Sequence, residues 1–464
     1  MNHNLPWAYN DGASDPATPD VQFYSPTAPE FLFGADATEI VIHARAIRRC
    51  VGLTWTVARS AFAEPFRSGR GEPLPNGTFV LRIATGGLHP GFYDVRVRID
   101  TGMGKPLQGI CAFGYRADDM PMVDTRPADF RAFWEKAVAS LKKLRLEPQE
   151  SEHKVFTHDE ISEYNLKSAC LPGEFDPEGR VVEKAESFKV SFNGPGGKRV
   201  YGWVAKPEGA GPFPVMLVLP GGGVTPRPRP LDHARHGFLA MDIQIHGQDV
   251  DLEKEKYAVP IGYYDNFMFE PIENYYYRDV YLRAVQALNY LLSRADADQK
   301  RVVVVGGSQG GRLGITTAAL DSRVTAAVVA IPANSNCPYG DWAKECSGDW
   351  AWTPDGGWRK VPPREQKRSA GMDRAGPPIP PDTAENRCMP YYDAMNFAPD
   401  VKCGVFMNMG MIDPVSTPSG VYAIYKRLGA ADKAMVPLPG MAHDWSAEFD
   451  RRAYRWLARL RAAK

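Results

Sequence analysis

The feature that most constrains the fold is a run of four valines followed by a glycine-rich turn. Residues 302–305 are all valine, residues 306–310 read Gly-Gly-Ser-Gln-Gly, and apolar residues at helical spacing follow. A short β-branched run predicts a buried strand, so the order here is strand, sharp turn, helix. In this context G-x-S-x-G is the pattern of a nucleophile elbow, whose strained turn leaves no room for side chains beside the serine. An ordinary glycine-rich turn that binds phosphate is the alternative, but both common phosphate-loop patterns are absent from the sequence. We therefore predict that Ser308 is a nucleophile.

The rest of a catalytic triad is predicted downstream of this serine. A serine attacks at neutral pH only when a base takes its proton and a carboxylate orients that base. With this elbow the chain order is serine, acid, histidine. His443 is the only histidine after Ser308, so it is the predicted base. Asp413 follows a predicted strand and is the predicted acid. Its rivals fit less well, because Asp432 lies in a helix-end turn and Asp444 is adjacent to the base.

Two backbone N–H groups should bind the negatively charged oxygen of the reaction intermediate. We expect one from Gln309, the residue after the nucleophile. The other should come from the glycine run that follows the apolar stretch 215–219, at Gly222 or Gly223.

The length of 464 residues suggests two or more domains. Residues 1–30 are polar and predict an irregular arm. Residues 31–120 alternate with period two between turn signals, which predicts an antiparallel β-sandwich. Residues 121–464 alternate apolar strands with helices and predict an α/β-hydrolase catalytic domain with a doubly wound sheet. The sandwich is either a carbohydrate-binding or interface module or, as we favour, a structural cap.

An insertion at about 333–400 interrupts the sheet pattern and is rich in proline, glycine and tryptophan. We predict a lid over the site, whose aromatic faces either stack on sugar rings or hold the insertion to the body. The seven cysteines are odd in number and form no C-x-x-C, which favours thiols over disulfides. A disulfide within the lid is the alternative, and its candidate residues are Cys337, Cys346 and Cys388.

Charge and motif content exclude several classes of function. The formal net charge is zero, which argues against a nucleic-acid or anionic-membrane partner and fits a neutral substrate. No H-E-x-x-H is present, and the closest histidine pair, His233 and His236, predicts solvated loop residues. We therefore expect no metal and no cofactor. No signal-peptide pattern opens the chain, so the sequence as written predicts a cytoplasmic protein; a periplasmic or secreted location is the alternative if a leader was removed.

Residues 125–464 resemble the acetyl xylan esterase and cephalosporin C deacetylase family of α/β hydrolases, carbohydrate esterase family 7. The matching segments are 127–134, 275–282, 306–311, 321–327, 392–397 and 410–418. Gly-Ser-Gln-Gly together with the Tyr-Tyr-Tyr-Arg helix start makes the resemblance specific. It implies a serine esterase that removes O-acetyl or other short acyl groups from carbohydrate esters, such as acetylated xylan or xylo-oligosaccharides. It also implies Ser308, Asp413 and His443 as the triad, an acetylated carbohydrate or small-molecule ester as ligand, and a homo-oligomer.

Three positions depart from the family pattern. His246 stands where the family has the arginine of Arg-Gly-Gln, Asp444 replaces the glutamate of His-Glu, and Gly222 replaces the tyrosine of His-Gly-Tyr. Loss of the arginine removes a buried ion-pair partner, and the glycine opens the acyl pocket. The alternatives are another serine hydrolase, such as a peptidase or an esterase for larger acyl groups, and a non-catalytic carbohydrate-binding homologue.

Overall fold

The structure is a computed structural model of the 464-residue chain. It describes residues 8–9, 21–46, 50–59, 65–102, 104, 106–120, 124–167, 182–260, 269–333, 350–352, 358–360, 384–413 and 415–461. Among these residues, no helix has the length and apolarity needed to cross a membrane.

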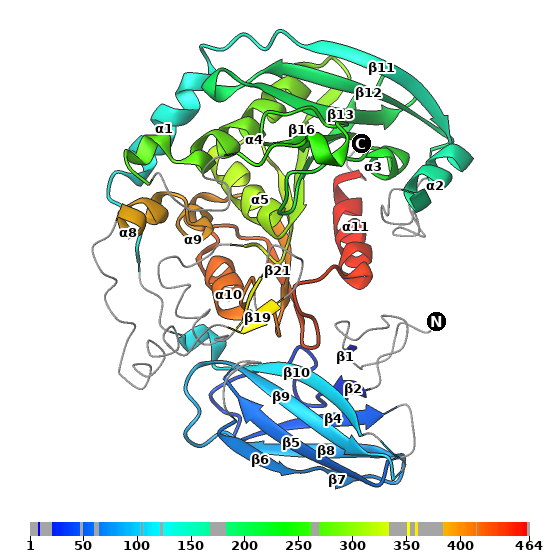
Figure 1. Ribbon diagram of the computed structural model, residues 1–464, viewed down its shortest axis with the longest axis vertical. Coiled ribbons are helices and arrows are strands. Elements are labelled where there is room, and N and C mark those ends of the chain that lie inside the picture. The colour runs from blue at the N-terminus through cyan, green and yellow to red at the C-terminus, as the bar shows by residue number, and fades with distance from the viewer. Residues whose placement is uncertain are drawn as a thin grey trace.

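The N-terminal part forms a β-sandwich of two five-stranded sheets in the described residues (Figure 1). The first sheet has the order β1 (Ala8–Tyr9), β2 (Val21–Tyr24), β4 (Glu39–Ala46), β8 (Thr78–Ala84) and β7 (Glu72–Pro73). The second has the order β3 (Leu32–Phe33), β10 (Leu107–Tyr115), β9 (Gly91–Asp100), β5 (Gly52–Ala58) and β6 (Arg67–Arg70). Inward residues of both sheets share one apolar core, which is why the sequence alternates with period two.

The prediction of an irregular arm over residues 1–30 is wrong at β2. This strand pairs antiparallel with β4, with Val21 opposite Ala46 and Phe23 opposite Ala44. Val21 and Phe23 are both buried in the sandwich core. Two apolar residues at alternate positions were sufficient to pair this strand with β4, although polar residues surround them.

The C-terminal part is built on a nine-stranded sheet in the described residues. Its order is β11 (Gln149–Thr157), β12 (Lys184–Asn193), β13 (Arg199–Pro207), β15 (Leu239–Gln244), β14 (Phe213–Leu219), β16 (Ala297–Gly307), β17 (Ala326–Ala330), β20 (Gly404–Gly410) and β21 (Lys433–Leu438). The pairings from β11 to β15 are antiparallel, and those from β15 to β21 are parallel. The central strands are buried, as their continuous apolar runs predict.

Helices cover both faces of this sheet (Figure 1). One face carries α1 (Phe130–Leu141), α4 (Tyr276–Ser293), α5 (Gln309–Leu320) and α10 (Pro418–Arg427), and the other carries α11 (Ala447–Arg461). The shorter α2 (His158–Lys167) and α3 (Leu231–Arg235) lie near β11 and β13. This is the predicted α/β-hydrolase architecture, in which the parallel strands deliver the following loops to one edge.

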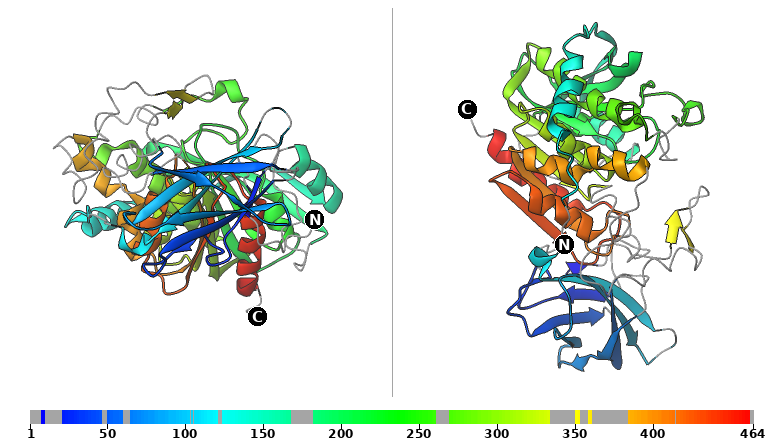
Figure 2. Two further views of the ribbon diagram at one scale, coloured as in Figure 1. Left: turned by 90° about the horizontal axis from the view of Figure 1, so that it is seen from below. Right: turned by 90° about the vertical axis from the view of Figure 1, so that its left-hand side faces the viewer.

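The sandwich packs against the carboxyl edge of the parallel strands (Figures 1 and 2). The backbone N–H of Ala112 in β10 donates to the carbonyl of Pro439, which directly follows β21, at 2.8 Å. The Tyr422 hydroxyl of α10 donates to Asp118 at 2.9 Å, and the rings of Phe92 and Tyr422 meet edge to face. The sandwich therefore lies beside the edge at which a hydrolase of this fold places its site.

The predicted lid at 333–400 is wrong at its C-terminal end. In the described part of the insertion, β18 (Trp350–Trp352) pairs with β19 (Trp358–Lys360). The segment from α8 (Ala384–Cys388) to α9 (Ala394–Phe397) instead joins the catalytic body: Trp134 Nε1–H donates to the Tyr391 carbonyl at 2.9 Å, and the Phe130 and Phe397 rings lie 4.8 Å apart. Aromatic packing on α1 decides this placement. Trp342, Cys337 and Cys346 fall outside the described residues, so the preference for thiols over a lid disulfide stays a prediction at these cysteines.

The prediction of solvated loop histidines at 233 and 236 is also wrong. Both lie at the helix α3, and His236 is buried. Their rings pack on the ring of Tyr454 in α11, and the Tyr454 hydroxyl is hydrogen-bonded to His233 Nδ1. The proline-rich sequence before them ends at the N-terminus of a short helix, a place where proline is well tolerated.

Candidate active site

Ser308 occupies the sharp turn between β16 and α5. Its φ of 56° and ψ of −119° lie in a region that side-chain-bearing residues seldom adopt. A Cβ on Gly306 would come within 2.5 Å of the Gly310 carbonyl, and one on Gly310 within 2.2 Å of the Leu219 carbonyl oxygen. These two glycines are therefore required by the close approach of backbone to backbone, and the predicted elbow is present.

Ser308, His443 and Asp413 form a continuous hydrogen-bonded chain. The distance from His443 Nε2 to Ser308 Oγ is 2.9 Å, and that from His443 Nδ1 to Asp413 Oδ2 is 2.8 Å. The acid follows β20 and the histidine follows β21, so adjacent parallel strands bring them together. A Cβ on Gly410 would lie 2.6 Å from the Ala442 carbonyl oxygen, so glycine here lets the two loops approach. Three residues separated by 105 and 30 positions in the sequence thus meet as predicted.

The environment of Asp413 fixes its orientation. Its side chain is buried, and its Oδ1 accepts from the backbone N–H groups of Val415 at 2.7 Å and Ser416 at 2.9 Å. Burial raises the pKa of Asp413, while the His443 contact and the two N–H groups oppose that rise. With Oδ1 occupied, Oδ2 is left to accept from His443 Nδ1–H. This sets the tautomer in which Nε2 can accept the serine proton.

The rival acids do not reach His443. Asp432 is exposed and lies where β21 begins. Asp444 is exposed as well, and its side chain accepts from the Trp445 backbone N–H at 2.7 Å.

The Gln309 side chain connects the elbow to the glycine loop. Its Oε1 accepts from the Tyr277 hydroxyl and its Nε2 donates to the Gly221 carbonyl, both at 3.1 Å. Its backbone N–H is the first of α5, where helical N–H groups have no intrahelical acceptor. Gly222, in the loop after β14, is exposed. The two predicted oxyanion donors thus come from segments that this glutamine ties together.

His246 holds the same loop from the interior. Its Nε2–H donates to the Gly223 carbonyl at 3.2 Å, and the Tyr276 hydroxyl is hydrogen-bonded to its Nδ1. Burial, opposed by the hydrogen bond to the Gly223 carbonyl and assisted by nearby cationic side chains such as Arg283, lowers the pKa of His246 to about 4. The imidazole is therefore neutral at physiological pH, and its Nε2 is the nitrogen that carries the proton.

A third side chain completes this arrangement. Gln244 Nε2 donates to the Thr225 carbonyl at 3.2 Å, and its Oε1 accepts from the His246 backbone N–H at 2.7 Å. The carbonyls of residues 221, 223 and 225 are thus each bonded by a different side chain. We define these three contacts as the loop clamp. Beside it, Arg227 and Asp242 form a two-point ion pair at 2.7 and 3.0 Å, so this interior region keeps a buried ion pair although the family arginine is absent.

Sequence reasoning missed Gln244, Tyr276 and Tyr277 as parts of the site. The two tyrosines lie in the Tyr-Tyr-Tyr-Arg segment. This motif indicated the family but did not indicate what the individual tyrosines do. No group of three or more metal-ligating side chains with suitable spacing occurs in the described part of the chain.

Comparisons with known proteins point to one family. The family model of acetyl xylan esterase (AXE1) matches residues 160–339 and 382–460, which is more than half of the chain. Acetyl esterase Axe7A of Xylanibacter ruminicola is 28% identical over 402 residues, covering 85% of this chain and 80% of that protein. Acetyl xylan esterases from Paenibacillus sp. R4 and Thermoanaerobacterium sp. share the fold with a TM-score of 0.54 each. They are 23% and 22% identical, and the likeness covers 74% of this chain and 97% and 99% of theirs. The chain is a carboxylic ester hydrolase and belongs to the acetyl xylan esterase family.

Proposed function

We propose that this protein removes O-acetyl groups from acetylated carbohydrates, with Ser308, His443 and Asp413 as its catalytic triad. The observation that carries the proposal is the unbroken chain from Ser308 Oγ through both nitrogens of His443 to Asp413, with 2.9 and 2.8 Å contacts. Membership of the acetyl xylan esterase family indicates that the substrate is an ester. The zero net charge of the chain fits a neutral carbohydrate better than an ionic substrate.

In the first half-reaction, Ser308 Oγ attacks the acetyl carbonyl carbon while His443 Nε2 takes the hydroxyl proton. The carbonyl oxygen becomes negatively charged, and the backbone N–H groups of Gln309 and Gly222 stabilise it. The carbon–oxygen bond to the sugar then breaks. His443 returns the proton to the departing sugar oxygen, leaving an acetyl group on Ser308 and a free sugar hydroxyl.

In the second half-reaction, water replaces the sugar. His443 takes a proton from the water, whose oxygen attacks the acetyl carbon and forms a second charged intermediate at the same donors. Collapse of that intermediate breaks the bond to Ser308 Oγ, which recovers its proton from His443, and acetate leaves. Asp413 keeps the imidazole in one tautomer and stabilises its charged form throughout.

Replacing Ser308 with alanine tests the proposal. Loss of the nucleophile should lower kcat for p-nitrophenyl acetate by about 10⁴-fold or more, because only binding and oxyanion stabilisation remain. Ser293→Ala is a matched control at the exposed end of α4, and its activity should equal that of the wild type. A fluorophosphonate probe should label the wild type and the control but not the variant. Wild-type activity of Ser308→Ala, or no labelling of the wild type, would reject the triad.

An acyl-length series on the wild type tests the leaving acyl group. Activity should decrease from acetate through butyrate to octanoate esters, and acetylated xylo-oligosaccharides should release acetate. A maximum at long acyl chains, or cleavage of peptides in place of esters, would favour another kind of serine hydrolase.

A further inference from the structure

Trp445 is a large aromatic side chain that the structure leaves in solvent. Its exposed fraction is 49%, and it is the bulkiest of the exposed apolar residues among those described. The others are Val51, Phe66, Leu74, Leu144, Val155 and Val259. Tryptophan has the most apolar surface to gain by burial, so an exposed indole near a catalytic centre is a candidate for ligand contact.

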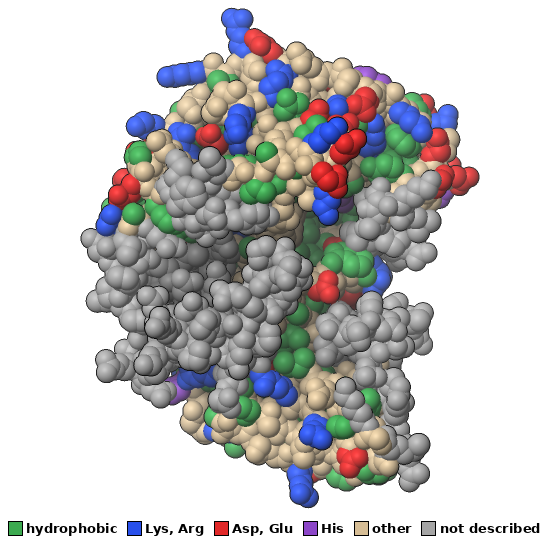
Figure 3. Space-filling view, in the orientation of Figure 1, with side chains coloured by type: hydrophobic (Ala, Val, Ile, Leu, Met, Phe, Trp, Pro, Cys, Tyr) green, Lys and Arg blue, Asp and Glu red, His purple; other side chains and the backbone are tan. Residues whose placement is uncertain are grey.

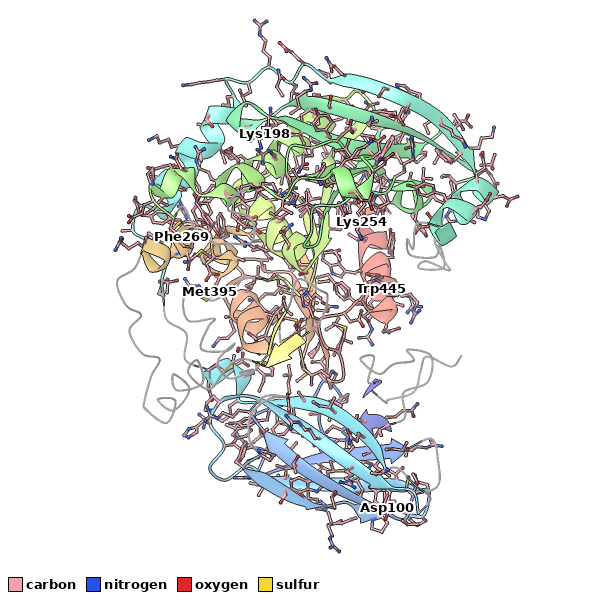
Figure 4. The ribbon with its side chains drawn as sticks, in the orientation of Figure 1. Asp100, Lys198, Lys254, Phe269, Met395 and Trp445 are labelled. Atoms are coloured by element: carbon pink, nitrogen blue, oxygen red, sulfur yellow. The ribbon has the colours of Figure 1, made fainter. Side chains whose placement is uncertain are left out.

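Trp445 lies close along the chain to His443, the histidine of the hydrogen-bonded chain at Ser308. It lies two residues after His443, so their Cα atoms are at most about 7.6 Å apart. Figure 4 shows Trp445 beside the first turn of α11, at the end nearer the sandwich. In the same orientation, Figure 3 shows a hollow between the catalytic body and the sandwich, with hydrophobic side chains along it. An exposed indole is thus carried by the same loop as the predicted base.

Hydrogen bonds hold the polar edge of this indole. Its Nε1–H donates to Asp450 Oδ2 in α11, and its backbone N–H donates to Asp444 Oδ1 at 2.7 Å. The start of α11 is itself fixed, because the Phe449 and Asp450 N–H groups donate to Ser446. The only polar atom of the side chain is therefore satisfied, and what faces solvent is the apolar ring. A ring held in one orientation loses little entropy when a ligand packs on it.

We propose that Trp445 is a stacking platform for a sugar ring of the substrate, next to the acetylated residue whose ester is cleaved. The axial C–H groups of a pyranose present an apolar face of about the size of an indole, while the ring hydroxyls remain in water at the edge. The inference rests on the proposed function, and it adds a binding position for the saccharide portion outside the acyl pocket. The proposal also explains why a tryptophan is exposed at this position. If the side chain had only a structural role, we would expect it to be buried.

Two substrates separate this role from the chemistry at Ser308. The acetylated xylo-oligosaccharide has sugar rings to stack, and p-nitrophenyl acetate has none. For Trp445→Ala we expect kcat/KM for the oligosaccharide to fall about tenfold relative to that for p-nitrophenyl acetate, mainly through KM. Trp445→Phe should recover most of the loss, because it keeps an aromatic face without the indole N–H. Trp445→Gln, which is polar and soluble, should repeat the loss seen with alanine.

Phe66→Ala is the matched control, since Phe66 is 47% exposed on the sandwich. It should leave the ratio of the two kcat/KM values unchanged. If the wild type hydrolyses both substrates and the ratio in Trp445→Ala and Trp445→Gln stays within twofold of its value, the stacking inference is overturned while the proposed function stands. If the wild type hydrolyses p-nitrophenyl acetate but no acetylated saccharide, the carbohydrate substrate is rejected and the inference with it.

Discussion

His443 and His246 both use their two ring nitrogens, but their surroundings differ. His443 lies on a loop at the site, its side chain is 24% exposed, and its partners are a hydroxyl and a carboxylate. His246 is 1% exposed, and its partners are the Tyr276 hydroxyl and a backbone carbonyl. A carboxylate stabilises an imidazolium, whereas burial penalises it.

The difference shows how one residue type serves two functions within one site. In the proposed mechanism His443 takes a proton from Ser308 while the Asp413 carboxylate stabilises the charged imidazole. His246, whose pKa is lowered to about 4, stays neutral and acts as a fixed hydrogen-bond donor to the glycine loop. In the proposed mechanism the triad side of the site therefore moves protons, and the loop clamp holds the position of the predicted oxyanion donors.

The largest effect on activity is expected from a change at Asp413, the carboxylate that distinguishes the surroundings of His443 from those of His246. Asp413→Asn would offer an amide N–H to Nδ1 and favour the tautomer in which Nε2 is protonated. We expect kcat to fall by about 10⁴-fold, measured with p-nitrophenyl acetate at pH 7.5. Asp432→Asn, at an exposed rival position, is the control and should retain wild-type activity. A loss of less than tenfold in Asp413→Asn would remove the acid role.

A smaller effect on activity is expected when the hydrogen bonds of the His246 side chain to Gly223 and Tyr276 are removed. His246→Leu would leave the Gly223 carbonyl and the Tyr276 hydroxyl without this partner, at about 1–3 kcal/mol for each buried group. We expect kcat/KM to fall about 10- to 100-fold, with the fluorophosphonate reaction slowed in proportion. His246→Gln retains a donor of similar reach and should recover part of the activity. Equal loss in both variants would mean that ring packing, not the hydrogen bond to Gly223, positions the loop.

A further effect, on stability and not on activity, is a pH dependence that His246 should impose. Its pKa is about 4 in the folded chain and 6.5 in the ordinary, unfolded reference. Between these values the unfolded chain binds a proton that the folded site excludes, so stability is full above pH 6.5 and falls as the pH drops towards 4. The contribution is at most about 3 kcal/mol.

Urea unfolding of the wild type and His246→Gln at pH 7 and pH 4.5 measures this contribution. The wild type should lose more stability than the variant between the two pH values. His233, whose pKa is also lowered to about 4 by burial, is present in both proteins and cancels in the comparison. Identical losses would show that His246 is not held neutral.

The elbow could be predicted because its sequence pattern is local. The histidine of the triad could be predicted because few candidate residues follow the serine. Ser308 stands in a five-residue pattern, and one histidine alone follows it in the sequence. The loop clamp could not be predicted in this way. Gln244 and His246 come from one segment and Gln309 from another that is distant in the sequence, and their shared target is backbone carbonyls, which leave no trace in the sequence. The burial of His233 and His236 was missed for a similar reason, since Tyr454 reaches them from the last helix.

The sequence by itself determined the α/β-hydrolase class and singled out Ser308, His443 and Asp413, which the fold joins by hydrogen bonds. Periodicity reports which face of an element is buried, and the glycines report where backbones must touch. Only the tertiary structure decided that the sandwich packs at the carboxyl edge of the sheet, that residues 384–400 join the body, and that His246 donates to the glycine loop. These outcomes depend on contacts between segments that are far apart in the sequence, and no local pattern of residues predicts which segments come into contact.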